Sequence, residues 1–276
     1  MPYHIFLPPL QLLLPCLYAA VVVLYAAAFF GDAPRAERFK SRLLVLTIVL
    51  HGVYLVMRTL QFDHAPITAV FEIMTVLSWC IAIAYLYIES RTRTGSTGFI
   101  ILSLAFLFQM ISSVFIRDVA EIPEYLHSFV LGFHVSAALL GYTAISLSAA
   151  YGVLYLLLYH EIKSSRLGVI YQRLPSLEVL ESMSRKAEAF GFAALTVAIM
   201  IGVVWLPKVF KDFSYWDPKL IATVVIWVLY AVGLTAKRTL GWQGRRTMVI
   251  AIAGFCIVVI SMLVINNFLS SFHTFH

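Results

Sequence analysis

Apolar runs of about 20 residues recur along this chain and constrain its fold most, because each can cross a bilayer as a helix. Of the 276 residues, 61% are hydrophobic and only 12% are charged. A soluble domain would carry about 25% charged residues. The sequence therefore predicts an all-α fold, a polytopic membrane helix bundle, and excludes a soluble globular domain.

Breaks rich in Gly, Pro and Asp divide the chain into about eight expected transmembrane helices. These lie at about 10–30, 43–61, 67–89, 98–116, 127–159, 187–206, 218–236 and 247–268. At about 1.5 Å per residue the fifth run exceeds the ~30 Å hydrocarbon core, so we expect it to protrude near Tyr159 and His160. We expect residues 1–276 to form a single integral membrane domain.

The distribution of Lys and Arg predicts the orientation in the membrane. Fifteen of these residues fall in loops on one side of the expected spans and four on the other. Because basic loops stay inside, both termini are expected on the outer (periplasmic or extracytoplasmic) side of the inner (cytoplasmic) membrane. The net charge of +6 then reflects topology and not a nucleic-acid-binding surface.

The longest inner loop, residues 160–186, has an amphipathic pattern. Leu174, Leu177, Leu180 and Met183 recur every three residues among Glu, Ser and Arg. The pattern predicts an interfacial helix. A docking site for a soluble enzyme is the alternative.

Histidines gather on one side of the predicted topology. Those at or near the outer face are His4, His64, His127, His134, His273 and His276. Imidazole is the commonest ligand of transition metals and also binds haem iron, although a loop or terminal histidine is more often only solvated. Between the sixth and seventh spans lies an aromatic loop, residues 205–219, with Trp205, Phe210, Phe213, Tyr215 and Trp216. Two axial imidazoles from separate helices above such a loop suit haem better than zinc or copper.

Two ionisable residues lie inside the second span. His51 falls near its middle, and Arg58 follows two helical turns later on the same face. Ionisable groups at membrane depth usually face a bundle interior and mark function. Arg58 can pair with Glu72 to lock the second and third spans, or it can hold a propionate or another anion. The sequence leaves both roles open.

Four segments carry a family resemblance. The first is His51-Gly-Val-Tyr-Leu-Val-Met-Arg58 with the later Glu72, and the second surrounds His134. The third is the aromatic loop with Trp205 and Trp216-Asp-Pro-Lys219, and the last contains His273. In this order, from about residue 46 to residue 273, they resemble the cytochrome c assembly family of the CcsA/ResC type, the haem-handling proteins of system II.

This chain departs from the family pattern at several positions. Phe210 and Ser214 stand where the family usually has tryptophan, Lys211 where it has glycine and Leu220 where it has glutamate. The family's membrane-embedded histidine would fall at Thr235, which cannot ligate haem strongly. The resemblance therefore favours haem binding more than complete ligase activity.

The resemblance implies a haem-binding membrane protein of cytochrome c-type biogenesis and haem transport. Non-covalently bound haem b would be ligated through its iron by His134 and His273, while Trp205, Phe210 and Trp216 would contact the macrocycle. Asp217 either contacts haem or begins the next helix with Pro218, and His51 and Arg58 are further candidates for cofactor binding. No catalytic residue is assigned.

The implied partners are haem, an apocytochrome c and a ResB/CcsB-type membrane subunit. Whether the chain is itself an enzyme stays open, since it can be one component of a cytochrome c haem lyase or synthetase complex. One alternative is a HemX-like membrane regulator of tetrapyrrole biosynthesis without ligase activity. Another is a structural membrane subunit whose histidines are merely packed.

Overall fold

The computed structural model describes residues 3–31, 33–118, 128–165, 167–209, 214 and 216–265. Over these residues the chain forms α-helices and one π-helical turn, with no strand. The all-α prediction is confirmed. The elements are α1 (Tyr3–Phe30), α2 (Pro34–Phe62), α3 (Val70–Thr92), α4 (Gly98–Phe115), α5 (Phe129–Lys163), α6 (Val169–Arg173), α7 (Leu177–Val209), α8 (Pro218–Thr239), α9 (Arg245–Ile260) and the π-helical η2 (Ser261–Ile265).

Helix length and hydropathy confirm the polytopic membrane bundle. Within the described residues, 7 helices are long and apolar enough to cross a membrane: α1 to α5, α7, and α9 with its extension to Leu263. The apolar part of α8, Leu220–Ala236, is shorter. Together these segments correspond to the eight expected spans, and the chain is a multi-pass membrane protein.

The chain divides into two compact units. Unit 1 comprises residues Met1–Ile122 and His160–Pro175, and unit 2 comprises residues Pro123–Tyr159 and Ser176–His276. The expectation of a single domain over residues 1–276 stays a prediction.

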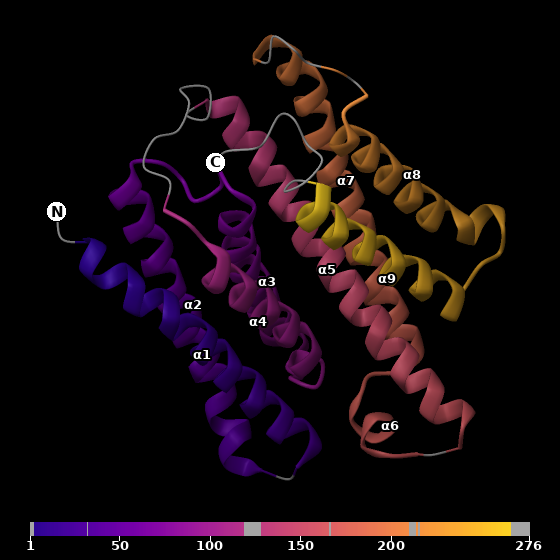
Figure 1. The fold of residues 1–276 in the computed structure, drawn as a ribbon. Helices are drawn as coiled ribbons and strands as arrows, with labels where there is room; N and C mark the ends of the chain where they lie inside the picture. Colours follow the sequence, from indigo (N-terminus) through magenta and orange to yellow (C-terminus); the bar gives the residue numbers. More distant parts are fainter. Residues whose placement is uncertain are drawn as a thin grey trace. The chain divides into compact units, whose positions relative to one another are not determined.

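Unit 1 is built on α1 to α4. Helix α1 packs against α2 and α4, and α3 packs against α4 and α2 (Figure 1). Leu7, Leu14, Tyr18, Val21 and Tyr25 are buried along α1 at spacings of three, four and seven residues. This spacing places them on one stripe of the helix. Leu7 and Leu14 form a core cluster with Tyr54 and Leu55 of α2.

Unit 2 contains α5, α7, α8 and α9, which Figure 1 shows running alongside one another. Glycines let α5 and α7 approach closely. A Cβ placed on Gly191 of α7 would lie 3.1 Å from the carbonyl oxygen of Gly141 and 3.2 Å from the amide nitrogen of Ile145. Such contacts are typical of small residues at membrane helix interfaces. A core cluster of Ile145, Leu195, Ile226, Tyr230 and Val258 joins the four helices.

The length predicted for the fifth span is confirmed. Helix α5 has 35 residues, which corresponds to about 50 Å and exceeds the hydrocarbon core of a bilayer. Which end of α5 leaves the membrane stays a prediction.

The predicted interfacial helix in the 160–186 segment is wrong. The structure has the short helix α6, which ends at the C-cap Leu174. Leu177, Leu180 and Met183 then lie in the first turns of α7, which runs unbroken for 33 residues from Leu177. No proline interrupts α7 before Pro207, and Leu180 and Ser184 are buried in unit 2. The apolar stripe therefore packs against protein.

Candidate functional site

His134 lies on α5 and is fixed by a contact with α7. Its Nδ1 lies 2.8 Å from the backbone oxygen of Ala198. A carbonyl oxygen only accepts hydrogen bonds, so Nδ1 must carry the proton and donate it. In the neutral ring Nε2 then carries the lone pair. Histidines that ligate metals almost always donate their other ring N–H in this way.

Gly202 makes room for this imidazole on α7. A Cβ placed on Gly202 would lie 3.1 Å from Cε1 of His134. Ala198 and Gly202 are four residues apart, so they present their backbone on the same face of α7. The ring is therefore held by a carbonyl at one helical turn and accommodated by a glycine at the next. This donor set fits one axial ligand of a haem iron.

The aromatic loop is described only in part. Trp205 lies in the last turns of α7 and is half-buried, whereas Trp216 precedes α8 and is 83% exposed. Phe210 and His273 lie outside the described residues, as do Phe213 and Tyr215. Of the predicted haem-site residues, the structure thus places His134, Trp205, Trp216 and Asp217 in unit 2.

Asp217 directly precedes α8, in agreement with the helix-start role that was one of the two expected for it. The side chain is buried, and its backbone oxygen accepts a hydrogen bond from the amide of Ile221 at 3.1 Å. Pro218 is the first helical residue, where its missing N–H has no helical partner to lose. The sequence Trp-Asp-Pro-Lys thus contains a helix start, with Trp216 exposed beside it.

His51 lies in unit 1, where both ring nitrogens have partners. The hydroxyl of Tyr18 lies 2.9 Å from Nδ1, and Oγ1 of Thr75 lies 3.0 Å from Nε2. Thr75 donates its own proton to Oε1 of Gln109 at 2.8 Å, so it accepts from Nε2–H while Tyr18 donates to Nδ1. His51 is fully buried. In this arrangement neither nitrogen is open to an external ligand.

Arg58 forms the predicted pair with Glu72. Its Nε and Nη2 donate to Oε1 of Glu72 at 3.1 and 3.0 Å. Oε2 of the same carboxylate accepts from the hydroxyl of Thr68 at 2.7 Å. The guanidinium also reaches two groups that the sequence did not indicate: Nη1 donates to Asp118 at 3.1 Å, and Nη2 donates to the carbonyl of Arg117 at 2.8 Å.

These contacts favour the structural role for the ionisable residues of the second span. The pair is almost completely buried, with 2% of the Arg58 side chain and none of the Glu72 side chain exposed. Two carboxylates and a carbonyl occupy the donors with which Arg58 would hold a propionate. His51 and Arg58 thus connect α2 to α1, α3 and the segment after α4.

Thr235 lies on the exposed surface of α8 and not in the core of unit 2. Its side chain is exposed on α8, and its hydroxyl donates to the carbonyl of Ala231 at 2.7 Å. The position at which the resemblance would place the family's membrane-embedded histidine therefore carries a hydroxyl bonded within its own helix.

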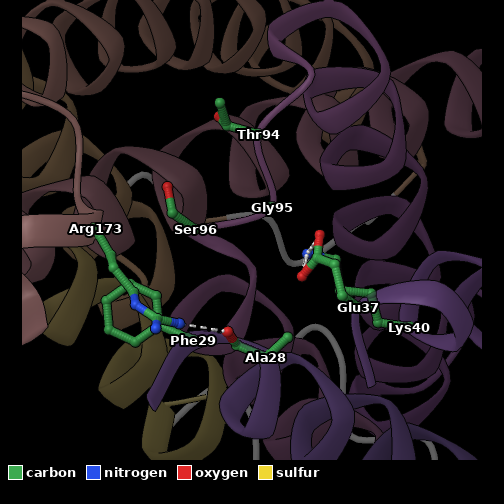
Figure 2. Close-up of a pocket in the computed structure, with 8 residues that line it drawn as sticks. All are labelled: Ala28, Phe29, Glu37, Lys40, Thr94, Gly95, Ser96 and Arg173. Carbon is green, nitrogen blue, oxygen red and sulfur yellow. Dashed lines mark hydrogen bonds and ion pairs between the residues drawn. The ribbon is translucent and has the colours of Figure 1, made fainter. Parts of the chain in front are cut away.

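A separate cavity of about 260 Å³ lies in unit 1. Figure 2 shows its charged lining residues, with Arg173 directed at the carbonyl of Ala28 and Glu37 beside Lys40. Arg173 donates to that carbonyl at 2.8 Å, and Lys40 pairs with Glu37 at 2.7 Å. Arg173 and Lys40 are both bonded to protein groups, so neither cation is available to bind an anionic ligand in this cavity.

Comparisons with known proteins identify the family of this chain. The profile of the family described as Cytochrome C assembly protein matches residues 67–273. The chain is 26% identical over 272 residues to the cytochrome c biogenesis protein CcsA of Mesostigma viride, covering 90% of this chain and 89% of the relative. It is 25% identical over 250 residues to CcsA of Guillardia theta, covering 84% and 83%. It is also 26% identical over 270 residues to CcsA of Prochlorococcus marinus strain NATL1A, covering 87% and 85%. The chain therefore belongs to the cytochrome c assembly family, in its CcsA-type branch.

Proposed function

We propose that this protein binds haem b non-covalently during cytochrome c assembly, with His134 and His273 as the two axial ligands. The observation that carries the proposal is the hydrogen bond from Nδ1 of His134 to Ala198. It assigns the lone pair to Nε2 and fixes the orientation of the ring, as a metal-binding histidine requires.

The other residues of the site position and enclose the ligand. Ala198 and Gly202 hold the imidazole of His134 against α7. Trp205, Phe210 and Trp216 would supply aromatic contact. Bound haem would supply the porphyrin that becomes attached to the thiols of an apocytochrome c.

The proposed site faces the outer side of the inner (cytoplasmic) membrane, because the basic loops define the inner side. On this topology both termini are outside. The outer loops are too short to bind an apocytochrome alone, so a ResB/CcsB-type membrane subunit would complete the complex. This chain would present haem within it and need not form the thioether bond.

The HemX-like regulator is the less favoured alternative. The relatives described above are named cytochrome c biogenesis proteins, and the family profile reaches His273. Deletion of the gene separates the two functions. We expect the loss of covalent cytochrome c; an unchanged cytochrome c level together with an altered level of an early tetrapyrrole enzyme would support the regulator.

The visible spectrum of the purified protein tests the ligand pair. We expect a Soret band that is lost in both His134→Ala and His273→Ala, because each removes one axial nitrogen. His160→Ala is the matched control, since His160 is exposed at the other end of α5. A haem-free wild-type protein, or a spectrum indifferent to both substitutions, would contradict the proposal.

Gly202→Ala should weaken haem binding without removing it. The added methyl group would lie 3.1 Å from His134 Cε1, so the ring must shift by a few tenths of an ångström. If the shift takes the ring off its rotamer it costs about 0.5–1.5 kcal/mol, and we therefore expect about a two- to tenfold loss of affinity. Haem titration of the purified apoprotein measures this. Gly132→Ala on α5 is the control, because a Cβ there meets no described atom within 4 Å; equal affinities for the two variants would argue against the His134 site.

A further inference from the structure

Unit 2 buries a carboxyl group that the proposed haem site does not use. Glu188 lies on α7 and is 3% exposed. No hydrogen bond or ion pair joins it to a residue whose side chain the structure describes. An uncompensated carboxylate in an apolar interior is strongly disfavoured, and such a group neutralises by taking up a proton.

The surface of α8 is shaped to receive this carboxyl group. A Cβ placed on Gly233 would lie 2.8 Å from Oε1 of Glu188, so only a glycine leaves the present position of the carboxyl group free. The carboxyl therefore points into the interface between α7 and α8.

A second polar group without a partner lies on the same face of α8. Tyr230 precedes Gly233 by one helical turn and is 1% exposed. Its hydroxyl has no hydrogen-bond partner among the described residues, and it lies within electrostatic range of Glu188. Buried polar groups that lack a protein partner are the setting in which a single water molecule is retained inside a protein.

We propose that Glu188 is a membrane-embedded proton-binding site, neutral in this conformation, which shares its proton with the hydroxyl of Tyr230 through one bound water molecule. The carboxylic acid donates to the water, and the water in turn bonds to the phenol. No covalent bond changes, and the proton is the only species bound or released.

Other titratable residues lie on the helices that carry or pack against this pair. Arg185 lies one turn before Glu188 on α7, and Cys256 of α9 is within electrostatic range of Tyr230. Lys237 follows Gly233 by one turn on α8. Among the described residues no group of three or more His, Cys, Asp or Glu side chains could hold a metal ion, so a proton suits this site better than a metal. The competing arrangement is an ionised Glu188 paired with Arg185 or Lys237.

Infrared spectroscopy of the intact protein in lipid nanodiscs separates these arrangements. At neutral pH we expect a carbonyl band of a protonated carboxylic acid that shifts on H/D exchange and disappears in Glu188→Gln. Glu178→Gln, which removes an exposed carboxylate from the same helix, should keep the band. A band that survives in Glu188→Gln would overturn the assignment.

Stability provides a second readout that does not depend on the band. Glutamine mimics a neutral carboxylic acid, so Glu188→Gln should unfold at the same temperature as the wild type. An ion pair with Arg185 or Lys237 would instead make this variant clearly less stable, and a variant that fails to fold would count equally against the proposal. Tyr230→Phe should shift the carboxyl band, and an unshifted band would refute the sharing of the proton with Tyr230.

Discussion

Replacing Glu72 with Ala is expected to lower the free energy of unfolding by about 3–5 kcal/mol, because the substitution leaves the Arg58 guanidinium buried without its main counter-charge. The Arg58 side chain is 2% exposed and Glu72 supplies the acceptor for both Nε and Nη2. Glu72 also accepts from Thr68 at the start of α3. Thermal or denaturant unfolding of the purified protein in detergent measures the loss.

Asp118 offers a matched control for this prediction. Its carboxylate contacts the same guanidinium at 3.1 Å, but its side chain is 71% exposed. Solvent screens such a pair, so Asp118→Asn should cost less than about 1 kcal/mol. The double replacement of Arg58 and Glu72 by methionines should recover most of the stability lost in Glu72→Ala. Equal effects of Glu72→Ala and Asp118→Asn would contradict the buried pair as the dominant contact.

The second large effect is expected for His51→Ala, which should destabilise the protein by about 2–5 kcal/mol. The substitution opens a cavity in the core of unit 1, where His51 is fully buried. It also removes the acceptor of the Tyr18 hydroxyl and the donor to Thr75. A buried donor left without a partner destabilises the folded state by about 1–3 kcal/mol, which contributes to the expected total. Unfolding of the variant by heat, followed by circular dichroism, measures the change.

Thr59→Ala on the same helix is a suitable control. The Thr59 hydroxyl only bonds back to the carbonyl of Leu55 within α2, so its removal should change stability by about 0.5 kcal/mol or less. The haem spectrum of His51→Ala gives a separate readout. We expect it to keep the wild-type Soret band, and a band lost without loss of stability would make His51 a haem ligand.

Much of the architecture follows from local sequence. The apolar runs predict the membrane helices because hydrocarbon forces the backbone to satisfy its own hydrogen bonds. The pairing of Arg58 with Glu72 was also predictable, because only a short loop separates the two helices that carry them. Pro218 likewise marks the start of α8 from sequence alone.

Contacts between distant segments were not predictable in the same way. The acceptor for His134 is a backbone carbonyl 64 positions away, and every residue has such a carbonyl. Tyr18 and His51, which are 33 positions apart, meet because α1 packs on α2. Glu188 gave no clear sequence signal, since it falls at the very start of the expected sixth span, next to Arg185 and Lys186 of the preceding loop. The interfacial helix was predicted wrongly because an amphipathic leucine stripe has the same spacing whether it faces lipid or protein.

The sequence by itself determined that this is an all-helical membrane protein of the cytochrome c assembly family, because hydropathy and motif order are properties of the chain. Apart from the Arg58–Glu72 pair, only the tertiary structure decided what its buried polar groups contact. It placed a carbonyl of α7 against His134, enclosed His51 between Tyr18 and Thr75, and buried Glu188 against Gly233. The physical reason is that a side chain's protonation state and availability depend on its neighbours in space, and helix packing selects those neighbours.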